Sequence, residues 1–360
     1  MAVALFDSSA ALAPLREQLH STALRVLDSG RFILGPEVEG FEREFASYLG
    51  AAHGVGVANG TDAITIALRA MGVGPGDEVV VPSFTFYASG EAIPPTGARP
   101  VFCDIDPATY CLTADTVRSA LTSRTKAVIA VHLFGNVAPV AEIEALGVPV
   151  VEDAAQAAGS RSAQARPGTL GTLATFSFYP SKNLACFGDG GMITTSDAGI
   201  AERARTLRFH GSTDKLTYEQ VGYNSRLDEL QAALLRVQLP HLDAWSDGRR
   251  RAAAAYERAG LGELVALPEP LPGASPAWHL YVIDHPQPDR LAEALGAASI
   301  GCKAYYRTPV HRQPAMSPWG ASSQLPGTDR AAARHLAIPM GPTLSEGQAE
   351  EVVAAVRLAG

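Results

Sequence analysis

Short apolar runs alternate with helical patterns through most of the first 240 residues. Runs rich in Val, Ile, Thr and Phe, bounded by glycine, proline or acidic residues, predict strands over 78–82, 127–135, 148–153, 174–180 and 190–195. Amphipathic segments predict helices over 61–72, 113–123, 138–147 and 197–211. This alternation predicts an α/β fold with a doubly wound, mostly parallel sheet. Ligands should then bind beyond the carboxyl ends of the strands.

The pattern changes after Arg226. An amphipathic helix is expected over 226–239, a further helix over 243–260, a proline-rich loop over 267–276 and a strand over 277–285. We therefore predict a large domain over residues 1–244 and a smaller C-terminal α+β domain over 245–360, joined by a helix.

The composition argues against several classes of protein. A net charge of −8 disfavours a nucleic-acid binder, and no apolar run is long enough for a membrane span. The N-terminus lacks the pattern of a secretory signal, and the four cysteines form no CxxC pair, so we expect a cytoplasmic protein with reduced thiols. The histidines show no metal-ligand spacing, and no metal site is predicted.

Two charged residues follow predicted strands. Asp153 ends the run 148–153, with Gln156 just after it, and Lys182 follows the run 174–180. A buried carboxylate is costly unless it meets a cation or strong donors. By itself, Asp153 is better explained as the N-cap of a following helix.

Two further features fall at strand ends. Gly60, Thr61 and Asp62 open the predicted helix 61–72, and a helix start binds phosphate through its free amides, although the same residues also suit an ordinary turn and cap. Phe86 follows the strand 78–82 and could pack in the core or support a flat ring.

Together these residues suit pyridoxal phosphate (PLP). Its aldehyde needs a lysine, and its pyridine nitrogen needs a carboxylate. Its phosphate is bound by amides and hydroxyls, and its ring stacks on an aromatic face. Because the carboxyl ends of parallel strands share one edge of a sheet, the sequence predicts a PLP site there.

Five ordered stretches, 29–50, 59–86, 151–160, 171–193 and 222–239, closely resemble the DegT/DnrJ/EryC1/StrS family of PLP-dependent sugar aminotransferases. Among them are "VEDAAQAAGS" and "FSFYPSKNL". The resemblance implies the type I (aspartate aminotransferase-like) PLP fold and a homodimer whose active sites lie at the subunit interface.

The resemblance also implies roles for individual residues. Lys182 matches the Schiff-base lysine, Asp153 the partner of the pyridine nitrogen, Gln156 the residue near the ring hydroxyl, and Phe86 the stacking aromatic. The implied phosphate contacts are Ser177, Thr61, the backbone around Gly60 and Asp62, and Asn224, which reaches the neighbouring subunit's phosphate.

The segment 302–315 is a candidate substrate site. Its cations and aromatics (Tyr306, Arg307, His311 and Arg312) suit a diphosphate and a sugar or base, although the segment could equally be a solvated loop. The resemblance favours a 3-keto sugar acceptor.

The expected activity is transfer of an amino group from glutamate to a nucleotide-linked keto-sugar, in the biosynthesis of an amino sugar for a surface glycan or a natural product. One alternative is a dehydratase of the same fold, which Lys182 disfavours because that branch carries histidine there. Another is a non-catalytic regulator. The sequence leaves open the sugar, the nucleotide, the exact donor and whether dimers pair into tetramers.

Overall fold

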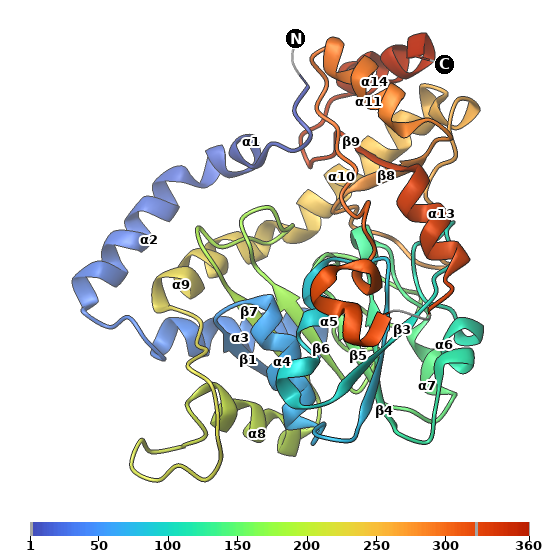
Figure 1. The fold of residues 1–360 in the computed structure, drawn as a ribbon. Coiled ribbons are helices and arrows are strands. Elements are labelled where there is room, and N and C mark those ends of the chain that lie inside the picture. The colour runs from blue at the N-terminus through green and yellow to red at the C-terminus, as the bar shows by residue number, and fades with distance from the viewer. Residues whose placement is uncertain (1–2, 321–322, 360) are drawn as a thin grey trace.

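The computed structural model describes residues 3–320 and 323–359. A seven-stranded sheet lies at its centre, in the order β1-β7-β6-β5-β4-β2-β3 (Figure 1). Within this sheet only β7 runs antiparallel to its neighbours, which confirms the predicted mostly parallel arrangement. The strands are β1 (His53–Val57), β2 (Glu78–Pro82), β3 (Arg99–Cys103), β4 (Thr125–Val131), β5 (Val150–Asp153), β6 (Leu173–Ser177) and β7 (Gly191–Thr195).

The sequence pattern missed two of these strands. β1 reads "HGVGV", and glycine weakens the strand signal; β3 reads "RPVFC", and proline interrupts the backbone hydrogen bonds of a strand. β3 tolerates its proline because it lies at an edge of the sheet. The predicted strand 127–135 is too long, since β4 ends at Val131 and a 3₁₀ turn covers Leu133–Gly135.

Helices pack around this sheet. The expected helices 61–72, 113–123, 138–147 and 197–211 correspond to α4, α6, α7 and α8, with ends displaced by one to three residues. The helices are α1 (Ser8–Leu12), α2 (Arg16–Ser29), α3 (Pro36–Leu49), α4 (Gly60–Ala70), α5 (Tyr87–Glu91), α6 (Ala114–Ala120), α7 (Val140–Glu144), α8 (Ala198–Arg208), α9 (Glu229–Gln238), α10 (Leu242–Arg258), α11 (Pro288–Ala297), α12 (Ser317–Gly320), α13 (Pro326–Arg334) and α14 (Glu346–Ala359).

A second, smaller sheet lies in the C-terminal part. Its strands β8 (Tyr281–Asp284) and β9 (His335–Ile338) are antiparallel. They share a hydrophobic core with α10, α11 and α14, which Figure 1 shows at one end of the molecule. The predicted domain boundary between residues 244 and 245 falls inside α10, and the division into two domains stays a prediction.

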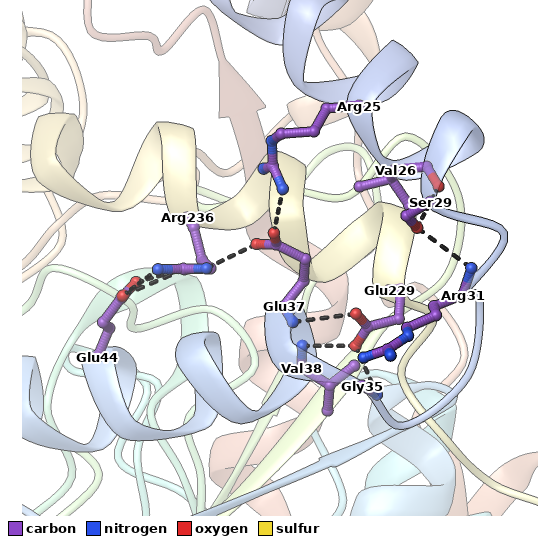
Figure 2. Close-up of polar contacts among 10 residues, drawn as sticks. All are labelled: Arg25, Val26, Ser29, Arg31, Gly35, Glu37, Val38, Glu44, Glu229 and Arg236. Atoms are coloured by element: carbon purple, nitrogen blue, oxygen red, sulfur yellow. Dashed lines mark hydrogen bonds and ion pairs between the residues drawn. The ribbon is translucent and has the colours of Figure 1, made fainter.

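A buried carboxylate joins α3 to α9. Glu229 accepts hydrogen bonds from the backbone amides of Gly35 (2.8 Å), Glu37 (3.0 Å) and Val38 (2.8 Å) (Figure 2). These amides lie at the start of α3, where the helix cannot satisfy them and its dipole favours negative charge. Arg236 of α9 also pairs with Glu37 (2.6 Å), so α9, which leads into α10, is fixed against α3.

In the described part of the chain, every helix is too short or too polar to cross a bilayer.

Candidate active site

A cavity of about 680 Å³ lies at the carboxyl ends of the parallel strands. Its wall contains Phe6 from the N-terminal segment and His279 and Arg249 from the C-terminal part of the chain. The structure brings most of the sequence-predicted site residues into this wall: Gly60, Thr61, Asp62, Phe86, Asp153, Gln156, Ser177, Lys182 and Tyr306.

Asp153, the last residue of β5, presents a buried carboxylate to the cavity. Its Oδ2 accepts from Ser89 Oγ (2.7 Å) and its Oδ1 from the Ala155 amide (3.2 Å). Turns rather than a helix follow it, so Asp153 is not a helix N-cap. Among residues 3–320 and 323–359, no cationic nitrogen lies within 4.0 Å of this carboxylate, although Lys182 is near enough to feel its charge. A cationic group in the cavity would therefore be stabilised by Asp153.

Lys182 lies in the loop that follows β6. Its backbone amide donates to the Tyr179 carbonyl (2.8 Å), and its side chain is partly buried in the cavity wall. Burial lowers the pKa of Lys182 from 10.5 to about 8, while the negative charge of Asp153 acts in the opposite direction with a smaller effect. The side chain is thus a partly neutral amine near physiological pH, which is the state that attacks a carbonyl carbon.

The start of α4 forms a cradle for an anion. Asn59 caps the helix by accepting from the Asp62 amide (2.8 Å), while the first two helical amides, of Gly60 and Thr61, have no acceptor within the helix. A Cβ on Gly60 would lie 2.7 Å from the Cβ of Ser177, so only glycine allows the end of β6 to come this close. The Ser177 hydroxyl and the start of α4 therefore lie close together in the cavity wall, as phosphate binding requires.

Gln156 is held between two structural partners. Its Oε1 accepts from the Phe134 amide (2.7 Å), and its Nε2 donates to the Tyr306 hydroxyl (3.1 Å). The Tyr306 ring stacks on Phe134 with centroids 5.8 Å apart and meets Phe84 edge-on at 5.7 Å. Burial raises the pKa of Tyr306, so its phenol stays protonated and can donate into the cavity.

Phe86 is 56% exposed in the single chain, which makes it an accessible apolar face in the cavity wall rather than a core residue. The alternative, that Phe86 packs in the core, is wrong; Phe84, two residues earlier, is the fully buried aromatic.

Four predicted residues do not line the cavity: Asn224, Arg307, His311 and Arg312. Asn224 lies in an exposed segment. Arg307 pairs with Asp289, and Arg312 pairs with Asp329 (2.7 Å). His311 is buried, with its Nδ1 2.5 Å from Ser83 Oγ. Their roles in binding phosphate or substrate stay predictions.

The sequence patterns missed other residues that shape the site. Ser89, which donates to Asp153 from behind the cavity wall, follows the predicted strand 78–82 by seven residues. Arg249 and His279 carried no local signal, because α10 and the segment before β8 reach the cavity only through the fold.

Comparison with known proteins identifies the family. The family model described as the DegT/DnrJ/EryC1/StrS aminotransferase family matches residues 14–357. This chain belongs to that family. This chain is 46% identical to a dTDP-3-amino-3,4,6-trideoxy-alpha-D-glucose transaminase of Streptomyces venezuelae. The match covers 99% of this chain and 95% of the relative. This chain is also 43% identical, over 99% and 97% of the two chains, to a UDP-N-acetyl-3-dehydro-alpha-D-glucosamine 3-aminotransferase of Acidithiobacillus ferrooxidans.

Solved structures agree with this assignment. The structure of S. venezuelae DesV in complex with a ketimine intermediate superposes with a TM-score of 0.96 at 44% identity, covering 99% of this chain and 98% of that one. Bacillus subtilis NtdA with bound cofactor PMP gives a TM-score of 0.86 at 27% identity, covering 99% and 83%. The predicted type I PLP fold, the aminotransferase activity and the cofactor class are thereby confirmed for this DegT/DnrJ/EryC1/StrS family member.

The residues of the cavity fit PLP. The carboxylate of Asp153 has no cationic partner within 4.0 Å in the described chain, which suits a protonated ring nitrogen, and the cradle at the start of α4 suits a phosphate. Lys182 supplies an amine of lowered pKa in the same cavity. These residues therefore match the ring nitrogen, the phosphate and the aldehyde of the cofactor.

Proposed function

We propose that this protein is a PLP-dependent aminotransferase that moves the amino group of L-glutamate to a keto group of a nucleotide-linked sugar. The observation that carries this proposal is the presence of Lys182, with a pKa of about 8, and the buried carboxylate of Asp153 in one cavity. A dehydratase of the same fold is disfavoured, because the dehydratase branch carries histidine at the position that Lys182 occupies here.

When bound, PLP supplies a reactive carbonyl carbon and an electron sink for the bond that breaks. Asp153, oriented by Ser89 and the Ala155 amide, would hold the ring nitrogen. Ser177, Thr61 and the amides at the start of α4 would hold the phosphate, and Phe86 would cover a face of the ring. Lys182 Nζ would first hold the cofactor and then carry the proton that leaves the donor's α-carbon, a task suited to an amine that titrates near pH 8.

The names of the relatives support a nucleotide-linked sugar as acceptor. The S. venezuelae and A. ferrooxidans enzymes are both named for amino transfer at carbon 3 of a dTDP- or UDP-linked sugar. We therefore propose a 3-keto sugar nucleotide as the acceptor and an amino sugar for a surface glycan or a natural product as the outcome. Arg307 and Arg312 are the proposed partners of the diphosphate; replacing both by alanine should raise the KM for the sugar nucleotide far more than that for glutamate.

We also propose a homodimer with shared active sites. The segment between α8 and α9 projects from the body of the molecule (Figure 1) and carries apolar side chains that are 84% (Leu216), 60% (Tyr218) and 82% (Val221) exposed. Asn224, at the end of this segment, lies outside the cavity of its own chain. Both features support a contact in which Asn224 reaches the phosphate in the neighbouring subunit.

The central experiment is the half-reaction. The PLP-loaded enzyme is mixed with L-glutamate, and in the reverse direction with a panel of dTDP- and UDP-linked amino sugars, while the cofactor's absorbance is followed. Conversion to the pyridoxamine form is expected with glutamate and with 3-amino sugars. The Lys182→Ala variant should not turn over. Failure of the wild type with every amino acid and every amino sugar would contradict the proposal.

Subunit complementation tests the shared site. Lys182→Ala and Asn224→Ala homodimers should each be nearly inactive. If Asn224 serves the neighbouring subunit, a re-associated equimolar mixture should recover about a quarter of wild-type activity, because half the dimers then hold one intact site. No recovery, in a mixture shown by native mass spectrometry to contain hybrid dimers, would place Asn224 outside the partner's site.

A non-catalytic regulator is the second candidate function. It is favoured by one relative, 46% identical over 94% of this chain and 94% of its own, named pleiotropic regulatory protein in Geobacillus stearothermophilus. Bound cofactor without any half-reaction would support this candidate.

A further inference from the structure

A buried arginine lies in the wall of the cavity. Arg249 is in α10, is only 8% exposed, and lines the active-site cavity together with Lys182. A second cavity of about 280 Å³ also has Lys182 and Arg249 in its wall, with Phe6 and Ser181 as the other shared residues. Lys182 and Arg249 therefore both border the region where the two cavities adjoin.

Most of the hydrogen-bonding capacity of Arg249 is unused. Its Nη1 donates to the carbonyl of Trp278 (3.0 Å) and, over a longer distance, to that of His279 (3.4 Å). Its Nε and Nη2 groups donate to no residue within 3–320 or 323–359, and no carboxylate there lies within 4.0 Å of the guanidinium. Arg208 is buried to the same extent but pairs with Glu42. Arg249 is thus a buried cation without the anion that such a charge normally needs.

Its surroundings are basic. His279 lines the same cavity, and its buried Nδ1 has no hydrogen-bond partner in the described chain. Burial, together with the positive charges of Lys182 and Arg249, holds the pKa of His279 well below 6.5, and all three residues line the same cavity. Burial also lowers the pKa of Arg249 to about 10, which still leaves it charged at neutral pH. This end of the cavity therefore favours an anion.

The cavity wall that Arg249 shares with Lys182 indicates which anion binds here. The cofactor's phosphate has its own cradle at the start of α4. The diphosphate of a sugar nucleotide is separated by several bonds from a keto carbon at position 3. By contrast, the α-carboxylate of an amino acid is attached to the same carbon as the reacting amino group. A planar guanidinium with free donors matches a carboxylate by two parallel hydrogen bonds.

We propose that Arg249 binds the α-carboxylate of the amino-acid donor and so places the donor's α-carbon beside Lys182. This inference rests on the proposed function, in which an amino acid gives up its amino group in this cavity. Arg249 acts in donor binding and has no part in binding the sugar nucleotide.

The test uses L-2-hydroxyglutarate, an analogue of glutamate that keeps both carboxylates but cannot transfer an amino group. Its affinity for the PLP-loaded enzyme is measured by titration calorimetry for the wild type, Arg249→Met, Arg249→Lys and Arg250→Met. Arg250 is the matched control, because it is on the same helix, bonds to Asp247 and the Pro276 carbonyl, and lines neither cavity.

We expect Arg249→Met to weaken binding of the analogue by about 10- to 100-fold, the range for hydrogen bonds to a charged group. Arg249→Lys should lose less, because it keeps the charge without the planar fork. Arg250→Met should bind like the wild type. In steady state, Arg249→Met should raise the KM for glutamate and leave the KM for the sugar nucleotide unchanged.

Several results would overturn this inference. The first is that Arg249→Met binds the analogue as tightly as the wild type. The second is that Arg249→Met loses equal affinity for the analogue and for the sugar nucleotide. That result would indicate that Arg249 only supports the Trp278 and His279 carbonyls. If Arg249→Met does not fold, unchanged binding by Arg249→Lys decides against the inference, and selective loss supports it. A wild type that transfers amino groups yet does not bind the analogue contradicts the role of Arg249 alone, whereas a wild type that transfers none contradicts the proposed function.

Discussion

The ε-amino group of Lys182 should titrate far below an ordinary lysine in the cofactor-free enzyme. Burial lowers its pKa from 10.5 to about 8, against the opposing effect of Asp153. At pH 7 a group with a pKa of 10.5 is neutral in about 0.03% of molecules, and one with a pKa of 8 in about 9%, a gain of roughly 300-fold in reactive amine.

Competitive acetylation measures this difference, because only the neutral amine reacts. Cofactor-free enzyme and Nα-acetyl-lysine amide are labelled together from about pH 6 to about pH 11, and the labelled peptide that contains Lys182 is quantified by mass spectrometry. The matched variant is Asp153→Asn. Because the Asp153 charge raises the pKa of Lys182, removing that charge should lower the pKa further.

The same shift has a consequence for stability. Since the pKa of Lys182 is lower in the folded than in the unfolded protein, unfolding binds a proton between about pH 8 and 10.5. The stability of the cofactor-free wild type should therefore rise with pH across that window relative to Lys182→Met. An apparent pKa close to that of the reference amide, or a pKa raised by Asp153→Asn, would refute the reasoning.

Three further predictions concern residues that shape the site or the fold. Gly60→Ala should weaken PLP binding by about tenfold or more, because its Cβ would lie 2.7 Å from the Ser177 Cβ. Gly74→Ala is the control and should bind PLP like the wild type, because its Cβ would meet nothing within 4 Å. Equilibrium dialysis compares PLP binding by the two variants. Tyr306→Phe removes the acceptor of Gln156 Nε2 while keeping the ring, and should cost about 1 kcal/mol in urea unfolding; a variant as stable as the wild type would contradict this. Glu229→Ala removes the acceptor of three buried amides and should cost about 3 kcal/mol, against less than about 1 for the exposed Glu346→Ala, and equal losses would argue against the capping role.

Much of the fold was predictable because its signals are local. β2, β5 and β7 lie within the predicted runs, β6 begins one residue before its predicted run, and α4 and α8 end within a few residues of the predicted ends. Errors occurred where a local signal was weak. β1 contains glycine and β3 contains proline, and their strand conformation depends on pairing with β7 and β2.

The sequence by itself determined the half of the site that the parallel sheet assembles. Asp153 and Lys182 could be paired without a structure, because both follow strands whose carboxyl ends share one edge. Only the tertiary structure decided which side chains become buried without partners. Arg249 and His279 join the cavity through packing of the C-terminal part, and the missing counter-charge of Arg249 is a property of its surroundings. Hydrophobic periodicity reports which face of an element is covered, whereas the environment of a single charge depends on every segment that folds around it.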